Sequence, residues 1–233
     1  MLKIRKKGQD AKTHQEQGIV TILNKVSEVL SDYRKQFIVV ASIAAALCVI
    51  AGGYSLVRSA DERKASPLLA AAYESYTRSP GMSAADTTKA LELFRNVQKK
   101  YSGTMSGAIA QYYIGNCLVE LGRLDEALKE YQFFVAKYSG EKYLLALAYQ
   151  RLGYLYGTLG RQADAVKAFE QSEALGGPGV ATVELARIYE SSGNITESQK
   201  KFKIVQEKLG GTNWSVEAMG KVQKIETQKP VVK

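Results

Sequence analysis

The sequence Lys-Tyr-Ser-Gly ends one segment of the chain at Gly103 and recurs with its last residue at Gly140. Weaker copies end at Gly177 and Gly211, so the closing glycines are 37, 37 and 34 residues apart. Self-similarity at a period of about 20 to 50 residues is typical of solenoids, in which each repeat is one supersecondary unit. One unit cannot bury its apolar face alone, so successive units must stack. The repeat therefore constrains the fold of the chain after residue 65 more than any other feature.

A second glycine divides each unit into two predicted helices. It stands at Gly122 and Gly160 in Leu-Gly-Arg, and at Gly193 in Ser-Gly-Asn. Glycine tolerates the left-handed conformation that ends many helices, so we expect a turn at each of these positions. A small residue follows five positions later and an aromatic residue four positions after that, in the pairs Ala127 and Tyr131, Ala165 and Phe169, and Ser198 and Phe202. This pattern predicts two antiparallel helices that cross closely at the small residue, with the aromatic ring filling the seam.

The arrangement resembles the tetratricopeptide repeat, whose pattern is W-x2-L-G-x2-Y…A-x3-F…P. Residues 105–140, 143–178 and 180–211 match it, and a first unit over 67–103 has Ala90 and Phe94 in register. The Leu-Gly-x2-Tyr part of the pattern is met by Ile114-Gly115 with Leu118, by Leu152-Gly153 with Tyr156, and by Leu185-Ala186 with Tyr189.

The chain also departs from that pattern. Gln111, Tyr149 and Thr182 stand where the family has tryptophan, and only Pro178 approximates its closing proline. Ser79-Pro80-Gly81 interrupts the first unit. After the repeats, a last helix carries an apolar edge that we expect to cover the end of the stack, formed by Trp214, Ala218, Val222 and Ile225.

Residues 37–57 form a run of 21 residues without a charge. A helix of this length rises about 31 Å, close to the thickness of the hydrocarbon core of a bilayer. A cleaved signal peptide has a shorter apolar run and a short basic segment before it, whereas 36 residues precede this one. Cys48 does not read as a lipoprotein site, because Leu47 rather than a small residue precedes it. The segment is predicted to be an uncleaved signal anchor.

The distribution of basic residues predicts the orientation of this anchor. The 36 residues before it hold eight Lys and Arg, while the other side carries Arg58, Arg63 and Lys64 close by. Short basic tails stay in the cytoplasm, and large domains are translocated largely regardless of their charge. We therefore expect a single-pass protein of the bacterial inner membrane, with a cytoplasmic N-terminus and a periplasmic C-terminal domain.

The predicted architecture is all-α: a tetratricopeptide-like helical-hairpin solenoid of about four repeats plus a capping helix, following one N-terminal transmembrane helix. The boundaries are a basic tail with an amphipathic helix (1–36), the transmembrane helix (37–57), a linker (58–66), the repeats (67–211), the capping helix (212–227) and a tail (228–233). A soluble fragment that begins near Ser66 is expected to fold alone.

The amphipathic stretch has an apolar stripe from Ile19 to Tyr33. It fits a helix lying on the inner leaflet or docking on a membrane partner. It equally fits an extension of the membrane span with no partner of its own, and the sequence leaves these alternatives open.

Residues that would carry chemistry are scarce. The only histidine is His14, in the basic tail, so the large domain lacks the histidine of a Ser-His-Asp triad or a Cys-His pair. The cysteines, Cys48 and Cys117, fall in separate segments and form neither a disulfide framework nor a zinc motif. The net charge is +9, but basic and acidic residues are interspersed, and no concentrated basic stripe of the kind that nucleic-acid binders carry is present. We therefore expect no catalytic, cofactor or metal site and no nucleic-acid partner.

The resemblance to tetratricopeptide repeats implies a concave groove, lined by the first helix of each pair, that binds peptides or helices. On this register the groove positions are Tyr112, Asn116, Gln150, Tyr154, Arg187 and Glu190. The alternative is that these residues are exposed without a ligand. The most direct test is a double variant with alanine at Tyr112 and Tyr154, which on this interpretation loses binding but keeps its melting temperature.

The whole layout, a basic tail, one anchor and exported repeats, resembles the YfgM-like ancillary subunits of the bacterial Sec translocon. That resemblance implies partners among translocon subunits, periplasmic chaperones and unfolded exported chains, besides the lipid bilayer around the anchor. Outer-membrane assembly lipoproteins and the periplasmic coordinator of cell division have similar repeats but lack an uncleaved anchor. The alternative function is an inner-membrane scaffold for an envelope-assembly, secretion or cell-division complex.

Overall fold

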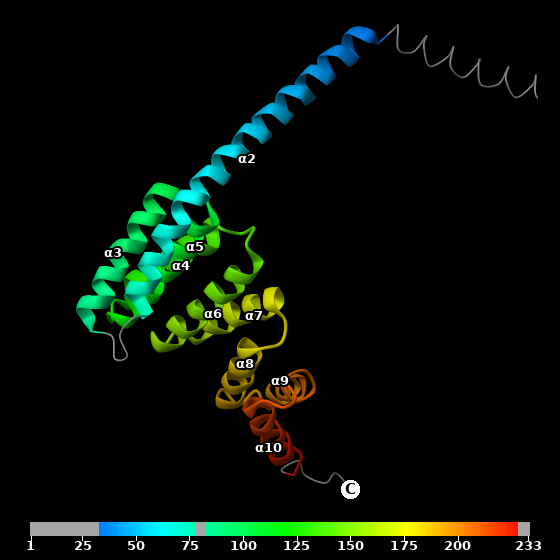
Figure 1. Cartoon of the computed structure of the whole chain (residues 1–233). Coiled ribbons are helices and arrows are strands. Elements are labelled where there is room, and N and C mark those ends of the chain that lie inside the picture. The colour runs from blue at the N-terminus through cyan, green and yellow to red at the C-terminus, as the bar shows by residue number, and fades with distance from the viewer. Residues whose placement is uncertain (1–32, 78–82, 228–233) are drawn as a thin grey trace, which may run out of the picture. The chain divides into compact units, whose positions relative to one another are not determined.

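The computed structural model describes residues 33–77 and 83–227 (Figure 1). These residues form helices and no strand, which confirms the all-α prediction. The helices are α2 (Arg34–Thr77), α3 (Ala84–Tyr101), α4 (Met105–Glu120), α5 (Leu124–Lys137), α6 (Lys142–Thr158), α7 (Gln162–Gly176), α8 (Val180–Ser191), α9 (Ile195–Lys208) and α10 (Asn213–Thr227). The stretch from Ile19 to residue 32, His14, Ser79-Pro80-Gly81 and the tail after residue 227 lie outside the described residues.

The chain divides into two compact units at the boundary between Val57 and Arg58. In the first unit every described residue is exposed, including the large apolar side chains from Phe37 to Val57. Helix α2 is long and apolar enough to cross a membrane. It also runs through residues 58–66, where a linker was expected, and continues to Thr77.

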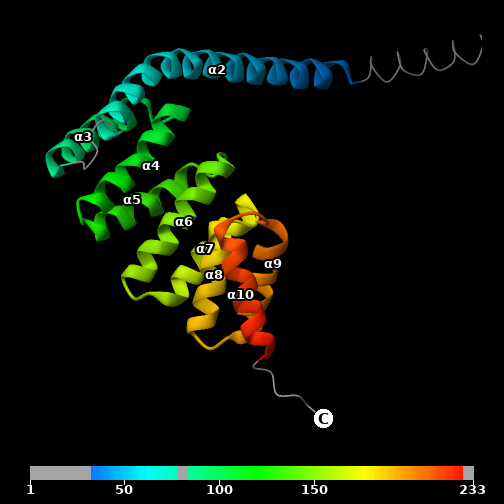
Figure 2. The same cartoon turned by 60° about the horizontal axis from the view of Figure 1, so that its bottom comes forward.

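The second unit is a stack of helical hairpins (Figures 1 and 2). From α3 onward each helix packs on the next one in sequence. The predicted turns are present: Gly122, Gly160 and Gly193 have φ of 70°, 71° and 77°. The end of α2 and α3 form the first hairpin, followed by α4 with α5, α6 with α7, and α8 with α9. We refer to the leading member of each hairpin as its first helix.

The helix crossings are as close as the small residues predict. Ala127 and Ala165 are fully buried. A Cβ added to Gly115 would lie 2.5 Å from the ring of Tyr131, and one added to Gly153 would lie 2.7 Å from the ring of Phe169. In these two hairpins the aromatic residue of the second helix therefore lies directly on the glycine of the first helix.

Ser198 occupies the same crossing position in the last hairpin. It is fully buried, and its Oγ has no hydrogen-bond partner among the described residues. Because a buried unpaired hydroxyl loses its hydration without compensation, Ser198→Ala is expected to raise the free energy of unfolding by about 1 kcal/mol. Urea unfolding followed by circular dichroism measures the change. The reverse exchange, Ala165→Ser, is the control and should lower it by a similar amount, and equal midpoints for Ser198→Ala and the parent would contradict the interpretation.

Helix α10 packs on α9 through Ala218, Val222 and Ile225, as expected of a cap. Trp214 was expected on this edge but is 37% exposed, and Ser215 takes the buried position instead. Successive residues of a helix differ by a rotation of about 100°. Ser215, three residues before Ala218, therefore lies on the same side of α10 as Ala218.

The part of α2 that follows Arg58 belongs to the folded repeats. Glu62 accepts hydrogen bonds from the backbone N–H of Ser106 (3.1 Å) and from its hydroxyl (2.6 Å), at the start of α4. Burial acts to raise the pKa of Glu62, but the hydrogen bonds from Ser106 outweigh it and the pKa is lowered. Ala65 is fully buried.

A fragment that begins at Ser66 would therefore lose part of the first hairpin. We expect a fragment of residues 58–233 to exceed a fragment of residues 66–233 by about 2 kcal/mol in free energy of unfolding, from a charge-assisted hydrogen bond and a buried residue. Parallel urea titrations provide the measurement. A Glu62→Gln version of the longer fragment should fall between the two, and identical midpoints for both lengths would show that residues 58–65 contribute nothing.

Candidate functional site

Side chains from each first helix reach the next first helix, and we call the surface that they share the bridged face. Each bridge joins residues at least 30 positions apart in sequence. The bridges are Tyr76 to Glu120, Arg151 to Tyr112 (Nε to Oη, 3.2 Å), Tyr154 to Glu184 (Oη to Oε1, 3.3 Å), Arg187 to Glu217 (Nη2 to Oε2, 2.6 Å) and Lys221 to Glu190 (Nζ to Oε2, 2.7 Å). They connect α2, α4, α6, α8 and α10 in order.

The bridges fix the distance between successive first helices more than they stabilise the fold. Exposed ion pairs contribute about 0 to 1 kcal/mol each. The strongest geometry is that of Arg187, whose Nε and Nη2 both donate to the carboxylate of Glu217. That hydrogen bonding lowers the pKa of Glu217 although burial acts in the opposite direction. A chain of such bridges holds successive first helices at one distance, as a surface for an extended partner requires.

Tyr112 and Asn116 are buried, which corrects the expectation that they are exposed groove residues. Tyr112 is 7% exposed, and its ring packs on those of Tyr113, Tyr131 and Phe134. Asn116 accepts a hydrogen bond from the Tyr131 hydroxyl (2.5 Å) in the interior. The physical reason is the ring that closes this hairpin, because Tyr131 carries a hydroxyl that must be paired when buried. Tyr112 still contributes its own hydroxyl to the bridged face.

The other four sequence-predicted residues are accessible. Tyr154 is 38% exposed and Arg187 is exposed, while Gln150 and Glu190 are half-buried. Tyr154, Arg187 and Glu190 are members of the bridges described above. Burial raises the pKa of Tyr154 to about 12, and Glu184 adds to that effect. The hydroxyl of Tyr154 therefore stays protonated and donates to Glu184.

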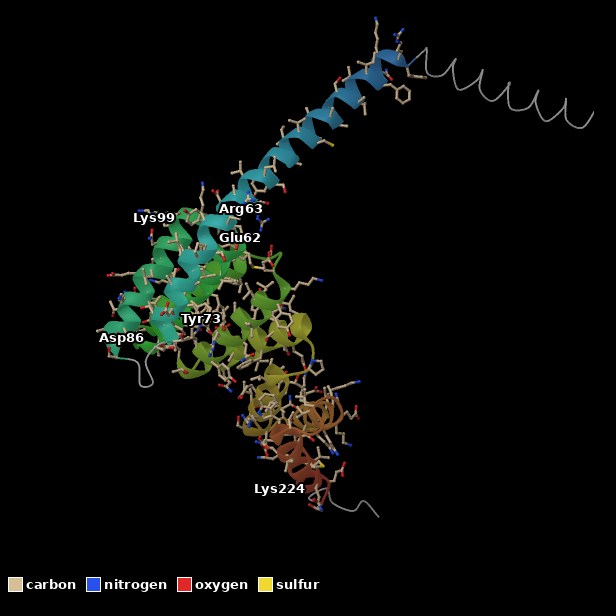
Figure 3. The ribbon with its side chains drawn as sticks, in the orientation of Figure 1. Glu62, Arg63, Tyr73, Asp86, Lys99 and Lys224 are labelled. Carbon is tan, nitrogen blue, oxygen red and sulfur yellow. The ribbon has the colours of Figure 1, made fainter. Side chains whose placement is uncertain are left out.

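The structure adds an aromatic group that sequence reasoning missed. Tyr73 and Tyr76 of α2 both pack edge-to-face on Tyr113 of α4, with ring centroids 5.4 Å apart in each case. Tyr73 is 45% exposed (Figure 3). Burial raises the pKa of Tyr113 to about 12, with a further contribution from Tyr73. Tyr113 could have been noticed in the sequence because it follows Tyr112 directly. Tyr73 and Tyr76 could not, because the interruption at Ser79-Pro80-Gly81 prevented the alignment of α2 with the other first helices.

Arg151 is the second residue that the sequence did not single out. It is exposed, and its Nε donates a hydrogen bond to the Tyr112 hydroxyl. Its Nη groups make no ion pair or hydrogen bond with any residue in the described ranges. The guanidinium thus places a positive charge among the tyrosines of the bridged face, with donors left for a carboxylate.

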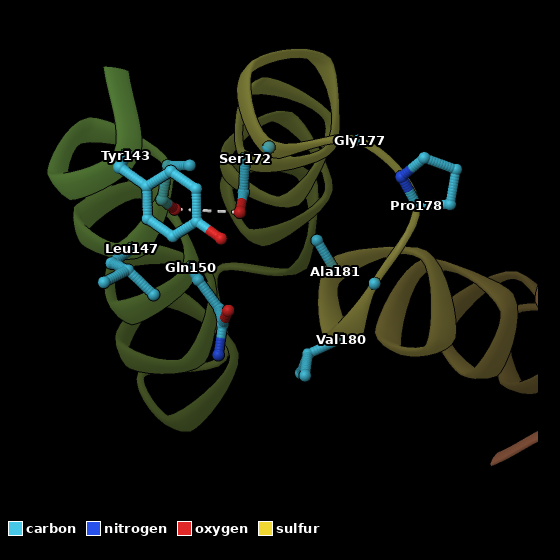
Figure 4. A pocket seen from close by; sticks show the side chains of 11 residues that line it. Tyr143, Leu147, Gln150, Ser172, Gly177, Pro178, Val180 and Ala181 are labelled. Atoms are coloured by element: carbon cyan, nitrogen blue, oxygen red, sulfur yellow. Dashed lines mark hydrogen bonds between the residues drawn. The ribbon is translucent and has the colours of Figure 1, made fainter. Parts of the chain in front are cut away.

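A pocket of about 150 Å³ lies where the third hairpin meets the fourth (Figure 4). Its walls come from α6, from the end of α7 and from the turn into α8. Gln150, a sequence-predicted residue, lines it together with the exposed side chains of Tyr143 (84%) and Leu147 (37%). A cavity of about this volume holds a benzene molecule in another protein. The pocket therefore has room for one apolar or aromatic side chain.

No group of three or more His, Cys, Asp or Glu residues within 33–77 and 83–227 is placed to hold a metal ion. The bridged face offers aromatic rings, hydroxyl groups and the guanidiniums of Arg151 and Arg187, all of which suit adhesion to another protein.

Comparisons with known proteins find matches for two stretches of the chain. Residues 82–141 and residues 146–175 each match a model described as tetratricopeptide repeat. A tetratricopeptide repeat protein from Parabacteroides merdae has a similar crystal structure, with a TM-score of 0.57 and 16% identity over 71% of this chain. This chain spans 61% of that protein's length.

A second similar crystal structure is the putative kinesin light chain of Podosopora anserina, described by its nearly identical TPR-like repeats. Its TM-score is 0.52 at 16% identity, over 72% of this chain and 87% of that one. At these identities the likeness concerns the fold alone. No curated protein matches the sequence.

Proposed function

The chain carries tetratricopeptide repeats, and from this we propose that it is a membrane-anchored scaffold that binds a protein partner on its bridged face. The observation that carries the proposal is the run of bridges from α2 to α10, which keeps aromatic and polar side chains of five helices on one surface. The anchor is the apolar helix over residues 37–57, whose exposed side chains need a nonpolar environment. The role is one of binding, without catalysis.

We propose further that the repeats lie in the periplasm and that the partners belong to protein export: Sec translocon subunits, periplasmic chaperones or unfolded exported chains. The support is the excess of basic residues before the anchor, together with the resemblance to YfgM-like subunits. The bilayer contacts the protein through residues 37–57. An envelope-assembly, secretion or cell-division scaffold is the alternative that the same architecture allows.

Two measurements test these levels separately. A reporter that is active only in the periplasm, fused after Lys233, should be active, and activity of a cytoplasmic reporter alone would contradict the orientation. Affinity purification from gently solubilised membranes should bring down translocon subunits from parent cells. Recovery should be lost with a double variant of the bridged face, Tyr154→Ala with Arg151→Ala. Recovery of cell-division or envelope-assembly proteins instead, with the same dependence on the two residues, would keep the scaffold and replace the partner.

A further inference from the structure

Helix α10 repeats the pattern of a first helix. An apolar residue followed by a small residue stands at the same place in α4, α6, α8 and α10. The small residues at this place are Gly115, Gly153, Ala186 and Gly220, and the apolar residue directly before each is Ile114, Leu152, Leu185 and Met219. Gly220 follows Ala186 by 34 residues, close to the period of the repeats. Helix α10 is therefore the first half of a fifth hairpin.

In the other hairpins these residues form the seat of the second helix. The ring of Tyr131 lies on Gly115 and the ring of Phe169 lies on Gly153, so near that a Cβ would not fit. Ala186 packs in one cluster with Phe202. Three times in this molecule, then, the seat receives an aromatic side chain from an amphipathic helix.

In α10 the same seat is open. Met219 is 46% exposed and Val216, one turn before Gly220, is 64% exposed. A Cβ added to Gly220 would meet nothing within 4 Å. A glycine inside a helix is less favourable than alanine. No close approach by a described residue explains the glycine at position 220. Capping helices at the ends of solenoids normally present a polar outer face. Helix α10 instead presents an apolar outer face, which a helix that served only as a cap would not have.

The charged residues of α10 show which side of the helix lacks ion-pair partners. Glu217, Lys221 and Glu226 are paired with Arg187, Glu190 and Lys203 respectively. Lys224 lies one turn after Gly220 on the open side and makes no ion pair with a described residue (Figure 3).

We infer that α10 is a second binding surface, which accepts an amphipathic helix from a partner protein and so completes the fifth hairpin. The partner helix carries a small residue, an aromatic residue four positions later that lies on Gly220, and an acidic residue near Lys224. The second helices α5, α7 and α9 define this chemistry, because each places a small residue and an aromatic residue four positions later against the equivalent seat. This surface lies apart from the pocket and from the tyrosines of α2 and α4, and it requires neither the membrane anchor nor the export partners proposed above.

A helical peptide that copies α7, residues 162–176, is a suitable probe. It has Ala165 and Phe169 in the required spacing, and its acidic residues outnumber its single lysine. The peptide is fluorescently labelled, held helical by a side-chain staple on its outward face, and titrated against the full chain in detergent. We expect saturable binding, weakened at least tenfold when Phe169 of the peptide is alanine and about threefold by Lys224→Glu in the protein.

Gly220→Leu in the protein fills the seat and should weaken binding at least tenfold without harming the fold, since the added side chain meets open space. Gly157→Leu is the matched control, because Gly157 is also helical, exposed and free of neighbours within 4 Å. It should bind like the parent.

Three results would overturn the inference. No saturable binding would show that the seat does not accept such a helix. Binding that survives Gly220→Leu would mean that the peptide has replaced α7 on α6 instead. Sedimentation in which the parent is a dimer and Gly220→Leu is a monomer would show that a second copy, rather than a partner helix, covers α10.

Discussion

Exchange of Gly107 for alanine is expected to destabilise the repeats by about 3 kcal/mol or more, one of the two largest effects that we foresee in the chain. Gly107 lies in the first turn of α4, where α3 turns into it. An added Cβ would lie 2.1 Å from the carbonyl oxygen of Tyr101 and 3.0 Å from the Cα of Ser102. These are backbone atoms, so no side-chain rotation relieves the overlap and the two helices must separate. Overpacking that moves backbone is at the costly end of core substitutions.

The same exchange would disturb the N-terminal cap of α4. The backbone N–H of Gly107 donates to Thr104 Oγ1 at 3.0 Å, and loss of such a cap costs about 1 kcal/mol. Thermal unfolding of the detergent-solubilised chain, followed by circular dichroism, gives the measurement. Gly103→Ala is the control, because Gly103 lies four residues earlier with nothing within 4 Å of an added Cβ. If both variants melt with the parent, the close approach of α3 and α4 at this point is absent in solution.

Alanine substitutions at Tyr112 and Tyr154 are expected to separate packing from binding. Tyr112→Ala should lower the free energy of unfolding by about 3 kcal/mol, because it removes a buried ring that contacts three others. Tyr154→Ala should cost about 1 kcal/mol, since that ring is 38% exposed and makes one edge-to-face contact with an aromatic ring of the described residues, that of Phe169, with centroids 5.2 Å apart. The sequence predicted an almost unchanged melting temperature for the double variant, whereas the burial of Tyr112 predicts a loss of stability.

For binding the order is reversed. If the partner lies on the bridged face, Tyr154→Ala should weaken its affinity about thirtyfold, the loss typical of an aromatic anchor worth about 2 kcal/mol. Co-purification and a titration with the captured partner measure it at a temperature where all variants are folded. Phe133→Ala is the control, because Phe133 is similarly exposed (44%) but lies on α5, a second helix. Equal losses for Phe133 and Tyr154 would move the partner off the bridged face.

The parts of the fold that sequence predicted well are those fixed by local chemistry. Gly122, Gly160 and Gly193 sit in left-handed turns that other residues adopt at a cost, so their spacing gave the hairpins directly. The packing of the small residues at 127 and 165 and of the rings at 131 and 169 could also be predicted, because few side chains fit where two helices cross closely.

The candidate site was predicted less well because it depends on tertiary contacts. Tyr112 and Tyr113 differ by about 100° around α4. Tyr112 packs on two rings of α5, whereas the surroundings of Tyr113 depend on the position of α2. That position was hidden by the interruption at Ser79-Pro80-Gly81. Glu62 could not have been assigned to the repeats either, since its role is to pair with Ser106, 44 residues away.

The burial of Cys117 has a practical consequence for chemical labelling. The chain has two cysteines, and Cys117 is the only one after Arg58. Its side chain is fully buried, and burial raises the pKa of its thiol to about 12. Since thiolates are the species that react with maleimides and disulfides, this thiol is inert at neutral pH. A cysteine introduced at position 216 or 154 would thus be the one reactive thiol of the repeats, and a spectroscopic probe attached there would report on α10 or on the bridged face without background from Cys117.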